Sequence, residues 1–451
     1  MFRNLPKYGS YKVAGDWLAE VPVSWSWEPA RTIFAERKDA GHGDEKMLSV
    51  TVGRGVIPQA DLLSSSAKKD SSNADKSKYK LVESGDVVYN KMRAWQGAAG
   101  GSTFRGIVSP AYIVMTPRNA LTRYLHHILR TPQFAKEAER WSYGITSDQW
   151  SLRPEHFKMI RFPVPPAEEQ AAIVKYLAHA NARIDKAIAA KRHLMSLLNE
   201  QANVQRAPLL QGLGPEQRLA NIVWEGPTNG VSPEISESGD LQTVSISVVR
   251  GGMVDVWESD IKYVERSAVR DVGKYALRAG DVLIVRGNGN LKLVGRAGRV
   301  SVDMPDRIYP DLLMRMRFRT GIDSRFVVAV LNSPAVREQI EATCRTAVGT
   351  YKLSGADVRG LRVPVPGLDV QHRIIRELEA IDANFTQITV KLSREVDLLR
   401  EFRARLVADV VTGQVDVRAI AATLPDAPES FDNTVSATDD DLEEALSEGE
   451  E

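Results

Sequence analysis

The chain has 451 residues, 43% of them hydrophobic and 26% charged, which is typical of a globular protein with two to four domains. It contains no apolar run of about eighteen residues, so it predicts no membrane span, and its N-terminal stretch lacks the apolar segment of a secretory signal. Cys344 is the single cysteine. This excludes a disulfide framework and, together with the missing signal, predicts a cytoplasmic protein.

The formal net charge of +1 hides an asymmetry along the chain. From Ala421 to the end there are five Asp, six Glu and no Lys or Arg, so the preceding residues carry 59 basic against 47 acidic side chains. A basic body favours an anionic partner, with nucleic acid first, although this surplus also fits a mildly basic surface. The segment 413–451 is predicted to end in a disordered acidic tail, a candidate competitor of DNA for basic surface.

Residues 1–165 are predicted to form a first module of mixed α and β structure. Short apolar runs bounded by Gly and Pro predict strands at LSVTV, DVVYN and AYIVM. The segment RYLHHILRTPQFAKEAERW predicts two short helices that meet at Thr131-Pro132. His126 and His127 lie on the first of these helices, and we interpret them as a structural pair rather than as metal ligands.

A repeat organises the rest of the chain. FPVPPAEEQAAIVKYL (162–177) leads into a predicted helix over 166–206, and VPVPGLDVQHRIIREL (363–378) leads into another over 366–412, with Gly413 as its predicted stop. Between them, residues 207–365 repeat the strand and helix signals of the first module in the same order, for example DVLIV for DVVYN. The sequence therefore predicts one module used twice.

Both long helices carry an apolar stripe with alternating steps of four and three residues, which is typical of a coiled coil. Only Lys191 and Glu395 interrupt the stripes. We predict that each helix supplies the other's partner in an antiparallel pair; the alternative is an amphipathic helix lying on a globular core. The stripe residues are Ile173, Leu177, Ile184, Leu194, Leu198, Ile374, Leu378, Ile381, Phe385, Ile388, Leu392 and Leu399. The predicted fold is mixed α/β, with two pseudo-symmetric domains separated by these helices.

Catalytic motifs are largely missing from the sequence. There is no Walker A loop, HExxH pair or GxSxG elbow, and Pro165-Pro166 is not preceded by the Asn or Asp of an adenine methylation loop. Glu36-Arg37-Lys38 matches half of a nuclease site. We therefore predict no catalytic site, no metal site and no cofactor in this chain.

The sequence instead favours a binding function. Loops after equivalent strands in the two modules are rich in Arg, Lys, Asn and Gln, whose side chains can pair with the base edges of DNA. Further such groups precede each Pro-x-Pro step. A solvated loop is the alternative for any single residue. The candidate DNA-binding residues are Lys91, Arg93, Trp95, Gln96, Tyr143 and Thr146 in the first module, and Arg286, Asn288, Asn290, Lys292, Arg345, Tyr351 and Lys352 in the second.

Taken in order, these features resemble the specificity subunits of type I restriction-modification systems over about residues 15–418. The resemblance is carried by VPVSWSWEPARTIF (21–34), by Gly85-Asp86-Val87 and Gly280-Asp281-Val282, by the two Pro-x-Pro helix entries and by LVADVVTGQVDVR (406–418). The second module departs from the pattern, since it lacks the Glu before Gln371 and the Pro-x-x-Trp opening.

The resemblance implies that each module reads one half of a split DNA target and that the helices fix the gap. It implies two methyltransferase and two endonuclease subunits as partners, which would hold S-adenosylmethionine, ATP and Mg²⁺, and no catalysis in this chain. The alternatives are a structural adaptor that does not read DNA, and a degenerate nuclease built on Glu36.

Overall fold

Two compact units make up the chain in a computed structural model, which describes residues 5–63, 75–144, 150–236, 239–347 and 349–426. Unit 1 comprises residues 1–192 and 392–451, and unit 2 comprises residues 193–391. Both are mixed α/β, as predicted, and each includes parts of two long helices, α6 (Ala167–Leu209) and α11 (Leu368–Val411). None of the helices in the described part of the chain has the length and apolarity needed to cross a bilayer.

Unit 1 is built on a four-stranded antiparallel sheet in the order β4-β11-β8-β9, with two-stranded ribbons around it. Its strands are β1 (Tyr11–Gly15), β2 (Leu18–Pro22), β3 (Ser26–Pro29), β4 (Phe34–Arg37), β5 (Leu48–Thr51), β6 (Gly55–Pro58), β7 (Lys80–Val82), β8 (Val87–Asn90), β9 (Ala99–Gly101), β10 (Gly106–Val108), β11 (Tyr112–Pro117) and β12 (Arg161–Val164). Its short helices are α1 (Ala30–Ile33), α2 (Gln59–Leu63), α3 (Thr122–Leu129), α4 (Pro132–Arg140), α5 (Pro154–Phe157) and α12 (Arg418–Ala422).

Unit 2 repeats this plan on a six-stranded sheet in the order β14-β23-β19-β21-β17-β16. Its strands are β13 (Glu216–Arg218), β14 (Val223–Asn229), β15 (Leu241–Val244), β16 (Val249–Arg250), β17 (Met253–Val254), β18 (Ile261–Val264), β19 (Val282–Val285), β20 (Gly287–Asn288), β21 (Ala297–Arg299), β22 (Arg307–Ile308), β23 (Leu313–Phe318), β24 (Arg345–Ala347), β25 (Thr350–Lys352) and β26 (Arg362–Pro364). Its short helices are α7 (Val272–Tyr275), α8 (Ser324–Leu331), α9 (Pro334–Thr343) and α10 (Gly355–Gly360).

A buried glutamine that follows each Pro-x-Pro step makes the same two hydrogen bonds in both units. In unit 1 the Gln170 carboxamide donates to the Pro165 carbonyl at 2.8 Å and accepts from the Leu121 amide at 2.7 Å, just before α3. Gln371 makes the same two bonds in unit 2, to the Pro366 carbonyl at 2.8 Å and from the Asp323 amide at 2.9 Å, just before α8. Each long helix is thereby tied to the first turn of a short one.

The departures of the second module from the repeat are explained by a single contact. In unit 1 the Trp25 indole donates to Glu169 at 2.9 Å, and both side chains are buried. Val370 takes the place of Glu169 in unit 2, and the tryptophan is missing as well. The Tyr8 hydroxyl also donates to Glu169, but a buried glutamate that lost the Trp25 donor would still be destabilised, so Trp25 and Glu169 are expected to be lost together.

The Gly-Asp-Val motif forms the turn into the central strand of each sheet. Gly85 and Gly280 have φ values of +98° and +90°, which residues with a side chain rarely adopt. The aspartate that follows accepts a main-chain hydrogen bond from three residues earlier, at 2.8 Å for Asp86 and 2.9 Å for Asp281. The motif shared by the two modules is therefore structural.

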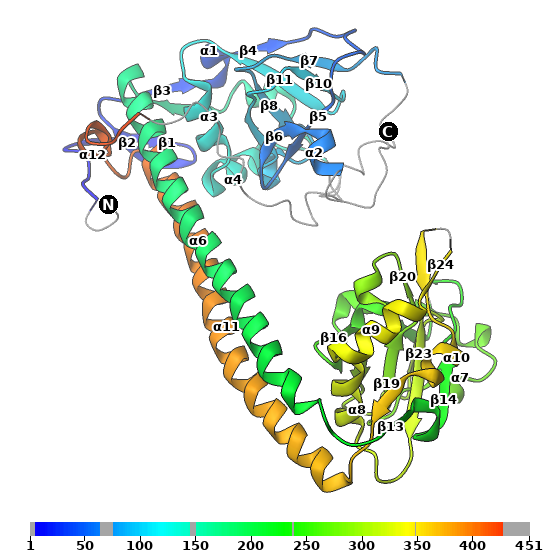
Figure 1. The fold of residues 1–451 in the computed structure, drawn as a ribbon. Coiled ribbons are helices and arrows are strands. Elements are labelled where there is room, and N and C mark those ends of the chain that lie inside the picture. The colour runs from blue at the N-terminus through cyan, green and yellow to red at the C-terminus, as the bar shows by residue number, and fades with distance from the viewer. Residues whose placement is uncertain (1–4, 64–74, 145–149, 237–238, 348, 427–451) are drawn as a thin grey trace. The chain divides into compact units, whose positions relative to one another are not determined.

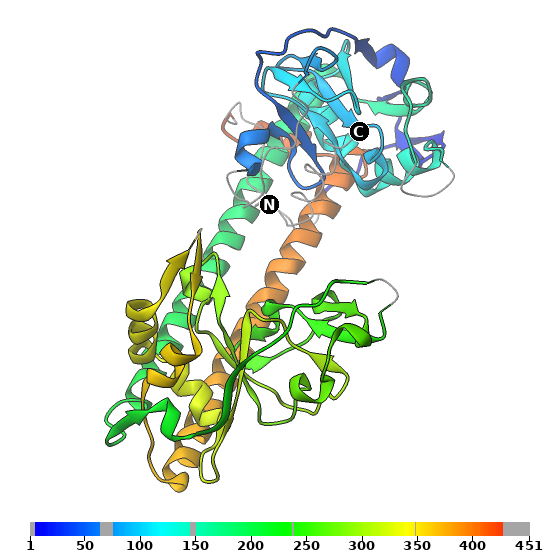
Figure 2. The ribbon, with the colours of Figure 1, turned by 90° about the vertical axis from the view of Figure 1, so that its right-hand side faces the viewer.

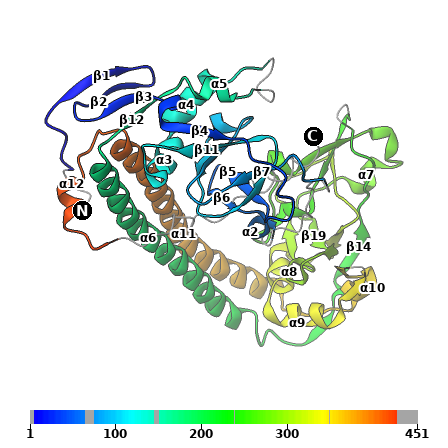
Figure 3. The ribbon, with the colours of Figure 1, turned by 90° about the horizontal axis from the view of Figure 1, so that it is seen from above.

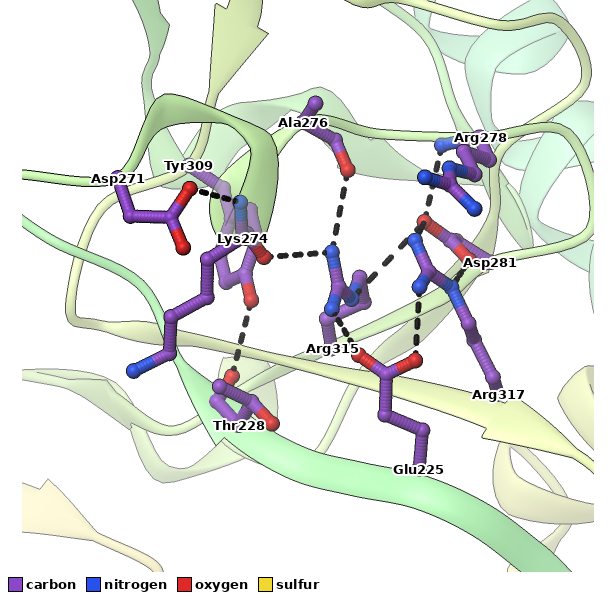
Figure 4. A network of polar contacts seen from close by, with 10 residues as sticks. All are labelled: Glu225, Thr228, Asp271, Lys274, Ala276, Arg278, Asp281, Tyr309, Arg315 and Arg317. Carbon is purple, nitrogen blue, oxygen red and sulfur yellow. Dashed lines mark hydrogen bonds and ion pairs between the residues drawn. The ribbon is translucent and has the colours of Figure 1, made fainter.

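A buried network of charges secures unit 2 at this turn (Figure 4). The Arg315 guanidinium, 2% exposed, donates to the carbonyls of Lys274 and Ala276 at 2.9 and 3.1 Å and to Glu225. Arg317 joins Glu225 to Asp281, with bonds of 2.8 and 2.6 Å. Burial alone would raise the pKa of Glu225, but the two arginines lower it below its ordinary value.

The histidine pair is structural, as predicted. His126 is buried on α3, and its Nδ1 accepts a hydrogen bond from the Gly101 amide at 3.3 Å. A β-carbon on Gly100 would lie 3.0 Å from the same nitrogen, so the strand approaches the ring closely because it carries glycine there. Burial holds the pKa of His126 well below its usual range, with Arg130 adding to the effect.

The helices α6 and α11 run antiparallel along each other (Figures 1, 2 and 3). Ion pairs show the direction, because partner numbers fall along α11 as they rise along α6. Asp185 pairs with Arg403, Lys191 with Glu395, and Arg206 with Asp382. Lys191 and Glu395, which interrupt the predicted apolar stripes, therefore pair with each other.

The buried seam follows the predicted stripe at both ends and leaves it in the middle. Leu194 and Ile388 are 45% and 37% exposed, so the prediction that they lie in the seam is wrong. Ile188 and Val396 are buried instead and pack together with Ile184. A helix of 3.6 residues per turn drifts by about 20° per heptad away from a stripe of period 3.5, which moves the contact to the next residue.

The remaining stripe residues pack in two ways. Leu198, Ile381 and Leu399 are half-buried, whereas Phe385 and Leu392 are buried. Four others belong to the cores of the two units, so the alternative expectation of a helix lying on a globular core is correct for the first turns of α6 and α11. These four are Ile173 and Leu177 in unit 1 and Ile374 and Leu378 in unit 2. α11 ends at Val411, and Gly413, with φ +78°, follows it as the predicted stop.

Shortening single side chains of α6 tests whether the helices pack through the observed seam or through the stripe predicted from the sequence. We expect Ile188→Ala to lower the free energy of unfolding by about 2–4 kcal/mol, because it leaves a cavity between the helices. Leu194→Ala, an equivalent truncation on the same helix, should cost less than about 1 kcal/mol, since Leu194 is 45% exposed and lies outside the buried seam. Urea unfolding followed by circular dichroism checks both variants, and equal losses would contradict the seam described here.

The arginine network gives a second stability prediction. Arg315→Ala should lower the free energy of unfolding of unit 2 by about 3 kcal/mol or more. The substitution removes a fully buried charge and leaves the carbonyls and the carboxylate that it binds without this donor. Arg319, which is exposed and directly follows β23, is the matched control, and Arg319→Ala should change stability by less than about 0.5 kcal/mol. Chemical unfolding of the two variants side by side is the measurement; a harmless Arg315→Ala would show that the network is dispensable.

Candidate nucleic-acid interface

Most of the predicted DNA-binding residues gather at one end of the central sheet of each unit, where β8 or β19 ends. In unit 1, Lys91 directly follows β8. Its amide donates to the Ala111 carbonyl at 3.1 Å, and its carbonyl accepts from the Leu152 amide at 2.7 Å. The second bond brings the segment that precedes the Pro-x-Pro step beside residues 91–96. As a result, the ring centres of Trp95 and Trp150 lie 5.4 Å apart.

Unit 2 has the same main-chain frame with different side chains. Arg286 directly follows β19, its amide donates to the Leu312 carbonyl at 2.7 Å, and its carbonyl accepts from the Leu353 amide at 2.9 Å. These bonds match those of Lys91 one for one. The three-stranded sheet β20-β25-β24 extends the frame by pairing Asn288 with Tyr351 and Arg345 with Lys352.

In unit 1 the predicted side chains differ in how they are held. Lys91 and Arg93 are half-buried, Gln96 is exposed, and the Trp95 indole donates to the Met92 carbonyl at 2.8 Å. Tyr143 is 57% exposed and packs against His156, with ring centres 4.9 Å apart. Thr146 lies outside the described residues. The frame therefore presents two cations and fixed aromatic rings, the groups that contact phosphates and stack on bases.

In unit 2, Arg286 is half-buried and donates to the Asp311 carbonyl at 3.4 Å. The Asn288 and Asn290 side-chain oxygens accept main-chain hydrogen bonds of 2.8 and 3.0 Å from within their own loop, so base reading by these residues would use the amide NH₂ groups. Three exposed cations surround this frame: Lys292, Arg345 and Lys352.

Three further lysines, none of them among the predicted DNA-binding residues, join Lys91 at the sheet end of unit 1. The Glu36 carboxylate accepts from Lys158 at 2.7 Å and lies 3.9 Å from Lys38. Lys80 donates to the Tyr112 carbonyl at 2.6 Å, next to the residue that binds the Lys91 amide. We call Lys38, Lys80, Lys91 and Lys158 the lysine cluster. Its members come from four separate segments, so no spacing in the sequence could have revealed it.

The electrostatics of the lysine cluster favour an anion. Glu36 lies among the four lysines, so the cluster keeps a formal surplus of positive charge. Burial lowers the pKa of Lys80, and the nearby charges of Lys91 and Lys38 lower it further, while Glu36 opposes them. An anion near these ammonium groups would relieve their mutual repulsion.

The structure also accounts for the half-motif of a nuclease site. Glu36 is an ion-pair partner of Lys158, and Arg37 donates to Asp86 at 2.7 Å. Within the described part of the chain, no group of three His, Cys, Asp or Glu side chains is arranged to hold a metal ion.

Comparison with known proteins adds an independent line of evidence. No family model matches the chain. It is 25% identical over 331 residues to the type I restriction enzyme EcoKI specificity subunit of Escherichia coli K12, covering 69% of each chain. It is 21% identical to the StySPI specificity subunit of Salmonella potsdam, covering 65% of each, and 21% identical to the MjaVIII specificity subunit of Methanocaldococcus jannaschii, covering 76% of this chain and 83% of that one.

Among solved structures, a chain from a study of complex assembly and conformational transition in the type I restriction-modification system shares the fold. The TM-score is 0.57 at 16% sequence identity, and the match covers 88% of this chain and 99% of that one. The predicted resemblance to type I specificity subunits is thus confirmed by sequence and by fold.

Proposed function

We propose that this chain, similar in sequence and fold to the specificity subunits of type I restriction-modification systems, reads DNA for such a system, with unit 1 and unit 2 each reading one half of a two-part target. One observation carries the proposal. The main-chain frame at the sheet end is the same in both units, whereas the side chains on it differ. A duplicated frame with different reading groups suits a target whose halves have different sequences.

The side chains on each frame suit direct readout in the major groove. Arginine and lysine pair with guanine, and asparagine and glutamine pair with adenine, through two parallel hydrogen bonds. Unit 1 would read with Arg93 and Gln96, and unit 2 with Arg286 and Asn288. The lysine cluster would contact phosphates, which position a protein on the duplex without selecting sequence.

The helix pair would set the gap between the two halves of the target. Ion pairs join the two helices within each unit, and a buried seam also joins them in unit 1. In this proposal the pair would act as a stiff spacer of constant length. We also propose that two methyltransferase subunits dock on this pair and that two endonuclease subunits complete the complex in the cytoplasm. Exposed apolar side chains on the pair, among them Leu194, Leu197 and Val390, support a protein partner there.

In this proposal the chain itself catalyses nothing. S-adenosylmethionine, ATP and Mg²⁺ belong to the partner subunits. The two rival functions make different predictions. A degenerate nuclease would cleave DNA as an isolated chain, in a way that depends on Glu36, and a structural adaptor would bind its protein partners without affinity for duplex DNA.

Exchange of one module tests the two-part reading. Replacing residues 207–365 with the corresponding module of another specificity subunit should change one half of the methylated sequence and leave the other half and the gap unchanged. Sequencing that maps methylated bases, in cells that also express the methyltransferase partner, is the measurement. A change in both halves, or in neither, would contradict independent reading by the two modules.

Lengthening the helix pair tests the fixed gap. Seven residues inserted after Ser196 in α6 and after Lys391 in α11 add about 10 Å to each helix at facing positions, or about three base pairs of DNA. We expect the gap in the methylated sequence to lengthen by about three base pairs while both half-sites are retained. The retained half-sites serve as the control for folding, and an unaltered gap would refute the role of the helices.

A further inference from the structure

The lysine cluster lies in the same unit as the root of the acidic C-terminal segment. The described chain ends at Asp426, whose carboxylate pairs with Lys175 on α6 at 3.3 Å. One residue earlier, the Pro425 carbonyl is 2.9 Å from Nε2 of His179. These contacts place Asp426, the residue before the segment 427–451, beside the third and fourth turns of α6 in unit 1.

The segment that follows is strongly anionic. Residues 427–451 contain ten carboxylates in twenty-five residues, and no lysine or arginine. It is joined to a body that carries a surplus of positive charge. At no more than about 3.4 Å per residue, twenty-five residues span up to about 85 Å, so the segment is not confined to the surface next to Asp426.

We propose that residues 427–451 occupy the lysine cluster of unit 1 when no DNA is bound there. The occupant and the surface have opposite charge, and both belong to the same unit. A tether of this length gives the segment an effective concentration near the millimolar range, so weak contacts are sufficient for binding. A row of carboxylates also reproduces the charge of a phosphate backbone, for which the cluster is suited.

The contact would act as a filter on DNA binding. Nonspecific duplex offers the lysine cluster only phosphates, so the tethered carboxylates compete with it directly. A cognate duplex adds hydrogen bonds to base edges, which the acidic segment cannot imitate, and displaces it. The segment would therefore weaken nonspecific binding more than specific binding. This consequence rests on the proposed function, whereas the docking itself does not.

The first experiment measures DNA binding by the full chain and by a chain that ends at Asp426. At about 50 mM salt, fluorescence anisotropy with a noncognate duplex should give a Kd at least about fivefold lower for the truncated chain, and the difference should shrink as salt screens the charges. A full-length variant with the ten carboxylates changed to Asn or Gln is the matched control and should behave like the truncated chain. Equal affinities for the three proteins would overturn the filter.

The second experiment needs no DNA. A labelled peptide of residues 427–451 should bind the truncated chain at low salt, and Lys38→Gln, Lys91→Gln and Lys158→Gln together should weaken that binding at least about fivefold. Three exposed lysines of the same unit, Lys12, Lys136 and Lys186, provide the control triple variant, which should bind as the parent does. No peptide binding, or equal loss in both triple variants, would overturn the docking. Peptide binding as expected with no affinity for any duplex would instead refute the proposed function.

Discussion

The antiparallel packing of α6 against α11 is the constraint on which the rest of the structure depends. It joins residues 392–411 to the first module, so unit 1 is assembled from two stretches of chain that residues 193–391 separate in the sequence. The hydrogen bond from the Asp416 amide to the Pro6 carbonyl, at 2.8 Å, is a consequence of this pairing. A β-carbon on Gly413 would lie 2.4 Å from the Pro22 ring, so glycine lets the chain turn there against the N-terminal segment. The short helix α12 of the same unit follows shortly after the C-terminal end of α11 (Figure 3).

Duplication explains which features the two units share and which they do not. A buried amide, aspartate or carbonyl must have a hydrogen-bond partner in both copies, so Gln170 and Gln371, and Asp86 and Asp281, keep the same roles. The partner itself can change. Asp86 is bound by Arg37 from β4, whereas Asp281 is bound by Arg317 from β23. The side chains at the sheet end are under no such requirement, and they differ between the copies, as Lys91 and Arg286 do at matching main-chain positions.

Much of this arrangement could be predicted from the sequence, because repetition and apolar periodicity are local signals. The module order, both long helices and the helix stop at Gly413 follow from them. The seam was misassigned at Leu194 and Ile388, since a stripe read with period 3.5 ignores the drift of a real helix. The lysine cluster could not be predicted, because Lys38, Lys80 and Lys158 meet Lys91 only once the sheet has formed. Likewise, the sequence shows that Trp25 and Glu169 lack counterparts in the second module, but only their contact explains why the two are missing together.

The central claim is that two copies of one frame, carrying different side chains, read two separated stretches of DNA. Genome-wide mapping of methylated bases in cells that express this chain with its methyltransferase partner tests the claim most directly. The account predicts one motif of two unlike specified parts divided by a gap of constant length and free sequence. A single uninterrupted motif, or two parts at variable spacing, would contradict it.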